Sequence, residues 1–363
     1  MERETVAVYE QRAAEWRDRR RPRFLEQVRA LGTTIPESGI TADLGCGAGL
    51  HLAHLPRPVV ALDAALAMVR LARAEAPDAW PVQADLEALP FRRGALAAGW
   101  ARASYLHIPN ERVPWAFAQL HDALAVGAPA HLVLHAGESS GLLTDDDFPG
   151  RYFSAWSTAA LTDVLFGAGF DVDSCAVDPD DEFWVEARVT RARTLPDTVG
   201  PGMRLLVCGL NPSVNAADAG VGFAGPGNRF WPAATAAGLV SRDRDARHAF
   251  TAHHLGMTDL VKRATPRAQE ITRAEYTTGL ARVQRMVEWL APDAVCFVGL
   301  AGWRAAVART AAAGVQPDRI GGRPVYLMPS TSGLNAGTSL AELVDHLRAA
   351  TSVADRFGVT GAP

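Results

Sequence analysis

Short apolar runs alternate with helix-like stretches along almost the whole chain, and this alternation is the feature that most restricts its fold. Parallel strands connected through helices produce such a pattern, because each crossover returns the chain to the same edge of the sheet. We therefore predict α/β architecture, with mostly parallel sheets covered by helices on both faces. The strand-bearing segments are 40–49, 58–63, 80–91, 95–108, 130–137 and 181–193 in the first half, and 203–213, 293–303 and 323–333 in the second.

A Pro-, Gly- and Thr-rich stretch, TLPDTVGPG at 194–202, divides the strand pattern into two sets and reads as a linker. The charge balance also changes there. Residues 1–200 hold 19 basic and 28 acidic side chains, whereas residues 201–363 hold 17 basic and 12 acidic ones. A basic second half suits a polyanionic partner. We predict one domain over 1–193, a linker over 194–202, a second domain over 203–350 and a frayed tail over 351–363.

Composition excludes several classes of protein. Charged residues make up 21% of the chain, and no apolar run approaches the roughly 18 residues of a membrane span. The first residues carry charge throughout and lack the apolar core of a signal peptide. Cys46, Cys175, Cys208 and Cys296 are scattered without paired spacing, which argues against a disulfide framework or a local metal site. We expect a cytoplasmic protein with no metal and no membrane contact.

The turn DLGCGAG at 43–49 follows a strand and brings three glycines close together. Glycines there let the backbone turn tightly and approach a ligand. Two carboxylates strengthen this nucleoside-site interpretation: Asp63 ends the next strand and Asp85 the third. A dinucleotide-binding dehydrogenase is the rival, but its G-x-G-x-x-G pattern is missing, since Leu50 and His51 follow the turn.

Residues 1–190 resemble the class I S-adenosylmethionine-dependent methyltransferases. The resemblance implies a Rossmann-like fold with a seven-stranded sheet and S-adenosylmethionine as cofactor. It also implies roles for six residues: Asp43, Gly45, Gly47 and Gly49 cradle the methionine moiety, Asp63 faces the ribose and Asp85 the adenine.

The methyl acceptor stays open. The segment GWARASYLHIPNE lacks both the Asp/Asn-Pro-Pro-aromatic loop of enzymes that methylate exocyclic amines of DNA bases and the Pro-Cys nucleophile of cytosine C5 enzymes. Arg102, Tyr105 and His107 could line an acceptor pocket, with His107 as general base. Capping of the strand and packing beneath the cofactor is an equally good interpretation of the three.

The second half opens with LLVCGLNPS at 205–213, a buried-strand pattern that ends in an Asn-Pro pair. Loops at the carboxyl ends of parallel strands hold the chemistry of α/β proteins. Three further segments follow in order: GFAGPGNRFW at 222–231, MTDLVKRATPRAQEI at 257–271 and LMPSTSGLNAG at 327–337. Together, over roughly 200–350, they resemble the mismatch-specific uracil/thymine-DNA glycosylases of the uracil-DNA glycosylase superfamily. This implies an α/β/α sandwich with a short parallel sheet and no cofactor.

The resemblance assigns Asn211 as the catalytic residue, whose amide oxygen orients a water, with Pro212 fixing the turn. In the base pocket, Phe223 stacks on the flipped pyrimidine, and backbone groups near Leu210 and Phe223 read the base edge. Ala216 leaves room for a C5 methyl group, so thymine is expected to enter as well as uracil. Asn228 either shapes the pocket or caps a helix; Phe230 and Trp231 are expected in the core.

The loop of residues 330–334 matches the segment that enters the duplex. The small residues Ser330, Thr331, Ser332 and Gly333 would grip phosphate, and Leu334 would wedge into the vacated base position. Some relatives place an arginine at the position of Leu334 or two residues later, where this chain has Ala336, which puts the stringency of mismatch reading in doubt. Lys262, Arg263 and Arg267 are expected to contact phosphates, with a plain surface cluster as the alternative.

Three functions remain open from the sequence. In the leading one, a uracil/thymine-DNA glycosylase acting on double-stranded DNA with G·U or G·T mismatches is fused to a methyltransferase of unknown acceptor. No lysine stands where a Schiff base would form, so we expect no β-lyase step. In the second, the protein is chiefly a methyltransferase, and its C-terminal domain targets it to nucleic acid. In the third, the N-terminal domain binds cofactor, or serves as a structural fold, without transfer.

Overall fold

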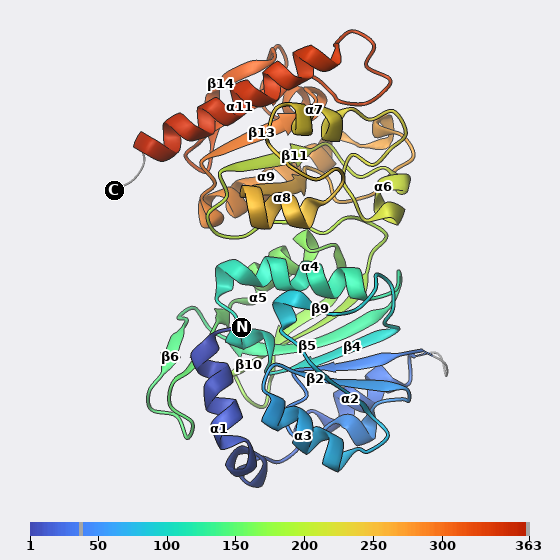
Figure 1. Cartoon of the computed structure of the whole chain (residues 1–363), viewed down its shortest axis with the longest axis vertical. Coiled ribbons are helices and arrows are strands. Elements are labelled where there is room, and N and C mark those ends of the chain that lie inside the picture. The colour runs from blue at the N-terminus through green and yellow to red at the C-terminus, as the bar shows by residue number, and fades with distance from the viewer. Residues whose placement is uncertain (36–38, 361–363) are drawn as a thin grey trace. The chain divides into compact units, whose positions relative to one another are not determined.

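A computed structural model describes residues 1–35 and 39–360 (Figure 1). The chain divides into two compact units, Met1–Ala192 and Arg193–Pro363. Residues 194–202, expected as a linker, belong to the second unit: Asp197 and Val199 are buried, and Thr198 exchanges backbone hydrogen bonds with Met257. Among the described helices none is long and apolar enough to cross a membrane.

The first unit is built on a sheet whose main path contains seven strands in the order β3-β2-β1-β4-β5-β10-β9, with a short β8 added beside β5. Strands β1 to β5 pair in parallel, and β10 runs antiparallel between β5 and β9. This is the expected Rossmann-like sheet. The strands are β1 (Thr41–Leu44), β2 (Val59–Asp63), β3 (Trp80–Gln83), β4 (Ala98–Arg102), β5 (Pro129–Ala136), β8 (Ala155–Trp156), β9 (Phe170–Val177) and β10 (Trp184–Arg191).

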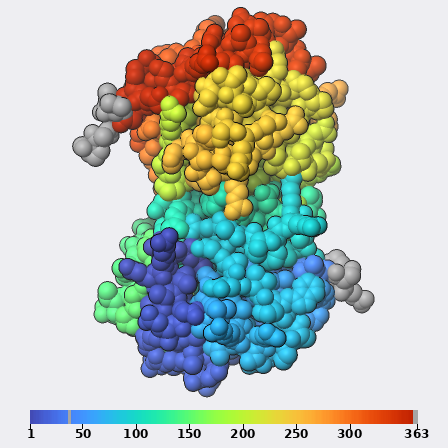
Figure 2. Space-filling model, in the orientation of Figure 1, coloured from blue at the N-terminus to red at the C-terminus, as the bar shows by residue number. Residues whose placement is uncertain are grey.

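Helices cover both faces of this sheet (Figure 1). On one face α4 (Val113–Ala123) and α5 (Thr158–Gly167) pack on Leu44, Leu62 and Leu132; on the other α2 (Leu25–Gly32) and α3 (Leu66–Glu75) pack around Val59 and Trp100. The opposite-facing residues alternate along each strand, as a pleated sheet buried on both sides requires. Helix α1 (Arg3–Arg19) lies beside the hairpin of β6 (Gly141–Leu143) and β7 (Arg151–Phe153), as Figure 2 shows in dark blue and green.

The second unit has a five-stranded sheet in the order β12-β11-β13-β15-β14. Four strands are parallel: β11 (Leu205–Gly209), β12 (Leu255–Asp259), β13 (Ala294–Val298) and β15 (Arg323–Met328). The edge strand β14 (Gly314–Ile320) is antiparallel, so the sheet is mixed rather than purely parallel as expected. The sequence of β14 is polar and largely exposed, so it contains no apolar run from which a strand could be predicted.

Helices form a layer on each face of the second sheet (Figure 1). One layer contains α7 (Phe230–Ala236), α8 (Ala246–His253) and α11 (Leu340–Thr360); the other contains α9 (Arg273–Leu290) and α10 (Ala301–Ala306). Short α6 (Val214–Ala219) follows the Asn-Pro loop. The expected frayed tail is wrong over 351–360, which completes α11 and buries Val353 and Ala354; residues 361–363 lie outside the described part.

Candidate active sites

Asn211 follows β11, at the carboxyl edge of the second sheet. Its side-chain nitrogen donates to the carbonyl oxygens of Pro212 and Arg263 (both 3.1 Å) and to Oγ1 of Thr265 (2.8 Å). Carbonyl oxygens can only accept, so these contacts fix which end of the amide is nitrogen. The side-chain oxygen has no hydrogen-bond partner within residues 1–35 and 39–360. Asn211 therefore presents one oriented acceptor.

Asp259 ends the neighbouring strand β12 and lies directly beside Gly209, its partner in the register. A Cβ built on Gly209 would collide with the Asp259 carboxylate and touch the edge of the Phe223 ring at 3.4 Å. Glycine is therefore required where the carboxylate and the ring approach the strand end. Burial raises the pKa of Asp259 to about 6, a shift that the charge of Lys262 moderates. The carboxylate is ionised at neutral pH.

Phe223 adopts a left-handed backbone conformation, with φ +60°. This conformation is uncommon for a bulky residue and has to be held by its surroundings. Its ring stacks on Phe230, with ring centroids 4.2 Å apart and the planes 22° from parallel. Phe230 and Trp231 are both buried in the core, as expected from the sequence, so they provide a fixed base for the Phe223 ring.

The loop of residues 330–338 places Leu334 at a fully exposed position. Its side chain is 96% exposed, far more than any other exposed large apolar side chain of the described residues. Arg229 fastens the loop: its guanidinium donates to the carbonyl oxygens of Thr338 (2.5 Å), Asn335 (2.6 Å) and Ser332 (3.4 Å). Gly333 lies against Gly227, where a Cβ would come within 3.0 Å of the Gly227 carbonyl oxygen. The loop is thus rigidly built around an exposed leucine.

In the first unit, the glycine turn follows β1 and closes on the end of β2. The amides of Gly45 and Cys46 donate to the Leu62 carbonyl oxygen (2.7 and 2.9 Å). All three glycines of the turn have positive φ, and a Cβ on Gly45 would collide with Ser104. Asp63 accepts from the amides of Gly47 and Ala65 (both 2.9 Å), while burial raises its pKa to about 6. These bonds hold the turn and the carboxylate together.

Asp43 is the penultimate residue of β1 and is only 2% exposed. Its Oδ2 has no hydrogen-bond partner in the part of the chain that the structure describes. Burial, and then the nearby charge of Asp63, raise the pKa of Asp43 to about 8, so the group is largely protonated at neutral pH. A buried carboxyl oxygen without a partner is costly, and a cationic ligand group would satisfy it.

A cavity of about 600 Å³ opens above the glycine turn. Asp43, Asp63 and the glycines at 45 and 47 line it. Arg102 and His107 line it too, whereas Tyr105 is buried beneath, against Phe117. The Nδ1 of His107 faces the carbonyl oxygen of Tyr152 (2.7 Å) and must carry the proton, so Nε2 accepts from the Tyr9 hydroxyl (2.8 Å). Burial lowers the pKa of His107 to about 3, so the ring is neutral.

Comparisons with known protein families match both units. Residues 196–351 match the uracil DNA glycosylase superfamily, and residues 42–127 match a methyltransferase domain. The chain is a fusion of a methyltransferase domain and a uracil DNA glycosylase superfamily domain. The residues present fit the S-adenosylmethionine expected from the sequence: the turn has the glycines, and Asp43 has a buried carboxyl oxygen, without a partner among the described residues, that could meet the cofactor's ammonium group.

Three of the solved structures similar to this chain are methyltransferases of low sequence identity. DhpI, in its complex with SAH, is 21% identical, covers 52% of this chain and 96% of its own, and gives a TM-score of 0.42. The S-adenosylmethionine-dependent methyltransferase of Mesorhizobium loti is 18% identical (46% and 100%, TM-score 0.36). The 1,6-didemethyltoxoflavin-N1-methyltransferase of Burkholderia thailandensis is 14% identical (52% and 85%, TM-score 0.41).

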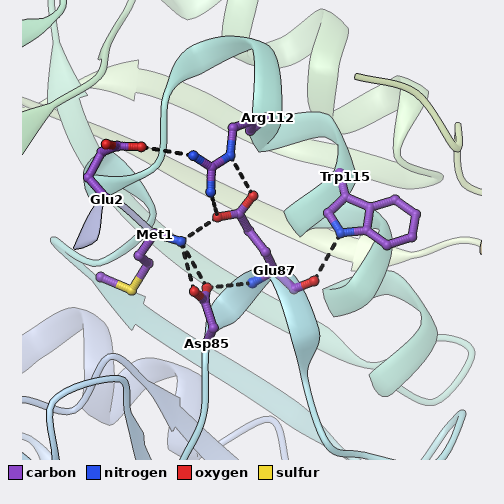
Figure 3. A network of polar contacts seen from close by, with 6 residues as sticks. All are labelled: Met1, Glu2, Asp85, Glu87, Arg112 and Trp115. Carbon is purple, nitrogen blue, oxygen red and sulfur yellow. Dashed lines mark hydrogen bonds and ion pairs between the residues drawn. The ribbon is translucent and has the colours of Figure 1, made fainter. Parts of the chain in front are cut away.

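Within the methyltransferase domain, Asp85 belongs to a polar network that the sequence did not predict (Figure 3). Both of its carboxylate oxygens accept from the amino group of Met1 (3.0 and 2.9 Å), and one also accepts from the amide of Glu87 (3.0 Å). Glu87 in turn binds Arg112, which also contacts Glu2 (2.8 Å). Asp85 is thus already paired in this structure, so an adenine amino group would have to compete with Met1 for it.

Within the glycosylase-superfamily domain, the expectation that Lys262 contacts DNA phosphates is wrong. It is only 4% exposed, and its ammonium group lies 2.8 Å from the Asp197 carboxylate, which also binds Arg282 (2.5 Å). A buried ammonium group cannot reach a DNA phosphate. Arg263 and Arg267 are at the surface, where they pair with Glu275 (2.7 Å) and Glu270 (3.3 Å). Of the three basic residues, only these two arginines are accessible.

The remaining predicted pocket residues are placed as follows. Ala216 is buried on α6, and the side chain of Leu210 packs toward the core near Gly302, which leaves only its backbone for a ligand. Asn228 accepts from the amide of Phe230 (2.9 Å), the first residue of α7, and so holds the turn just before the helix, whose N-cap residue is Arg229. The sequence analysis missed Asp259 and Arg229. An Asp at the end of a strand was the available signal for Asp259; nothing local indicated Arg229.

Proposed function

We propose that the C-terminal domain is a DNA glycosylase that removes uracil, and also thymine, from G·U and G·T mismatches in double-stranded DNA. The oriented amide of Asn211, two residues after Gly209, where the Asp259 carboxylate and the Phe223 ring approach the end of β11, is the observation that supports this most directly. Small Ala216 suits a pocket that admits the thymine methyl group. The basic surface residues of this domain suit a DNA partner.

The proposed chemistry is hydrolysis of the N-glycosidic bond after the base is flipped out of the helix. The pyrimidine stacks against Phe223, and the Asn211 oxygen accepts a hydrogen bond from a water and aims it at C1′. As the water oxygen bonds to C1′, the bond from C1′ to the base nitrogen breaks, and its electron pair leaves with the base. The Asp259 carboxylate takes the water proton and stabilises the cationic sugar.

DNA contact is assigned to the loop of residues 330–334 and to Arg263. Leu334 is exposed on a loop held by Arg229, so it can enter the base stack without the loop first having to become ordered. The hydroxyls of Ser330 and Ser332 and the backbone of Gly333 are proposed to meet the phosphates and the unpaired guanine. Asn228 shapes the pocket by fixing the start of α7.

For the N-terminal domain we propose methyl transfer to an acceptor that enters the cavity beside the glycine turn. The bound cofactor supplies an electrophilic methyl group. Asp43 and the glycines 45, 47 and 49 would hold the methionine moiety, and Asp63 the ribose hydroxyls. Asp85 would reach the adenine if Met1 moves away from it.

The glycosylase is tested with duplexes that carry a single G·U, G·T, A·U or G·C pair. After incubation with the full chain, alkali cleaves the strand wherever a base was lost. We expect cleavage at G·U and G·T, little at A·U and none at G·C, and loss of cleavage in Asn211→Ala. A protein that binds these duplexes and cleaves none would instead be a methyltransferase with a DNA-targeting module.

The methyltransferase site is tested by calorimetry with S-adenosylhomocysteine. We expect the wild-type protein to bind and Asp63→Ala to bind at least about tenfold more weakly, since a charged hydrogen-bond partner is lost. If the folded wild-type protein gives no binding heat, the proposed transfer is contradicted and the domain is a structural fold.

A further inference from the structure

The methyltransferase cavity is lined by arginines and aromatic rings as well as by the glycine turn. Arg20, Arg23, Arg102 and Arg151 all line it. Arg20 pairs with Asp147 (2.7 Å), Arg23 with Asp181 (2.8 Å) and Arg151 with Asp146. Neither Arg21 nor Arg102 pairs with a carboxylate among the described residues; Arg21 is exposed, whereas Arg102 is half-buried.

Arg102 is held in place by rings instead of by an anion. Its guanidinium lies 5.3 Å from the ring centroids of both Phe24 and Trp184. Burial, and then the charges of Arg23 and Arg20, lower the pKa of Arg102 to about 10, yet it stays protonated at neutral pH. A partly buried cation near two like charges is poorly stabilised until an anion binds.

Unsatisfied hydrogen-bonding atoms gather at the same place. Nε of Arg102 and Nε1 of Trp184 are buried donors without a partner in the described part of the chain, and the hydroxyl of Ser104 also lacks one. Trp184 is 9% exposed and Ser104 3%, and all three residues line the cavity. Buried polar groups without partners are rare in folded proteins. Unpaired donors on two residues that line the cavity, one of them a guanidinium without a carboxylate partner among the described residues, favour an anionic ligand there.

Aromatic side chains form the walls beside these donors. Phe153, Phe183 and Trp184 line the cavity, with Phe183 and Trp184 4.8 Å apart between ring centroids and Phe153 6.2 Å from Phe183. Aromatic side chains that line a cavity favour a ligand with an apolar or aromatic ring. The volume of about 600 Å³ is within the range of small-molecule sites and excludes a folded macromolecule as the group that enters.

We propose that the methyl acceptor is a small aromatic carboxylate, whose carboxylate is bound by Arg102 and Trp184 and whose ring lies among Phe153, Phe183 and Trp184. This rests on the proposed methyltransferase function of the domain. An acceptor oxygen or nitrogen forms the bond to the methyl carbon while the carbon–sulfur bond breaks and its electron pair stays on sulfur. The proton that the acceptor loses passes to water.

The methionine moiety of the cofactor also carries a carboxylate, so the experiment separates the two sources. Its first arm measures binding of S-adenosylhomocysteine and of 5′-methylthioadenosine, which lacks the amino-acid group. Its second arm, with S-adenosylhomocysteine saturating, measures binding of 4-hydroxybenzoate and anthranilate and of their neutral amides. Both arms use the full chain as wild type, Arg102→Gln, Arg102→Lys and, as an exposed control outside the cavity, Arg70→Gln.

We expect the wild-type and Arg70→Gln proteins to bind at least one acid about tenfold or more tightly than its amide, the effect of one charge-assisted hydrogen bond. Arg102→Gln should lose that preference, and Arg102→Lys should keep part of it, with S-adenosylhomocysteine affinity unchanged in both. Absence of any preference for the acids in the wild type overturns the proposal. So does a loss of S-adenosylhomocysteine affinity in Arg102→Gln with 5′-methylthioadenosine unaffected, which assigns the guanidinium to the cofactor. If S-adenosylhomocysteine fails to bind the wild type, the methyltransferase function fails, while a preference for the acids still supports the anion site.

Discussion

Single side chains in both domains are tuned by what surrounds them. Asn211 has its nitrogen fixed by two carbonyl groups and a hydroxyl, and this turns a flexible amide into a directed acceptor. Asp259 and Asp43 are carboxyls whose pKa values burial raises, to about 6 and about 8. The two shifts have different consequences at neutral pH: Asp259 is ionised and able to accept a proton, whereas Asp43 is mostly protonated until a cation binds.

The raised pKa of Asp259 predicts the pH dependence of base excision. Only the ionised carboxyl can accept the water proton, so the single-turnover rate on a G·U duplex should fall as the pH drops through about 6 and level off above it. Asp259→Asn should lower the plateau by about 10²-fold and remove this acidic limb. The exposed Asp243→Asn serves as control. An unchanged limb in Asp259→Asn would show that another group titrates.

The raised pKa of Asp43 predicts that cofactor binding is coupled to the release of a proton. When the ammonium group of S-adenosylhomocysteine meets the protonated carboxyl, it favours the charged form, so binding at pH 7 should release close to one proton. Calorimetry in buffers of different ionisation enthalpy measures this number. Asp43→Asn should release none, and exposed Asp171→Asn should behave as wild type. Binding to the wild type without any buffer dependence contradicts the prediction.

At the scale of helices, strands and loops, local features could be predicted from the sequence, whereas contacts between distant segments could not. Strand ends and glycine turns are local features, so the positions of Asn211, Asp63 and the turn at 43–49 could be predicted from short segments. Pairings between distant segments could not. Arg229 donates to carbonyl groups more than a hundred residues further along the chain. Lys262 is buried against Asp197, and the Pro- and Gly-rich sequence around Asp197 had predicted a linker there.

The proposed wedging role of Leu334, in the loop of residues 330–338, can be tested by substitution. Leu334→Ala removes the apolar group that would fill the vacated base position. The complex then loses the free energy of burying one leucine side chain, so the rate on a G·U duplex should fall about tenfold or more. Excision from a single strand, which needs no wedge, should change little. Val315→Ala, an exposed apolar residue on β14, is the matched control. Equal losses on duplex and single strand would contradict a wedge.

The cluster of Asp197, Lys262, Thr258 and Arg282 ties the start of the second unit to β12 and α9. Burial alone would raise the pKa of Asp197, but the charges of Arg282 and Lys262 outweigh it and lower the pKa. Asp197→Asn leaves two buried cations without their anion, so the free energy of unfolding should fall by about 3–5 kcal/mol. Urea denaturation measures it, with exposed Asp318→Asn as control. A loss below about 1 kcal/mol would show the network to be dispensable.

The two units of the chain have separate apolar cores. The buried clusters of the first unit lie within Met1–Ala192 and those of the second within Arg193–Pro363, so each sheet has its own apolar interior. The acidic first 200 residues contain a small-molecule cavity, and the more basic remainder contains the proposed DNA site. This division agrees with a fusion in which each domain keeps its own substrate.

The central claim, that Asn211 directs the water in a DNA glycosylase, is tested most directly by single-turnover kinetics of the full chain on a G·U duplex. Asn211→Ala should lower the rate constant of base release by about 10²- to 10⁴-fold while duplex affinity stays within about threefold. Asn215→Ala, an exposed asparagine four residues later, should match the wild type. Base release by Asn211→Ala at the wild-type rate, or none by the wild-type protein, would contradict the account.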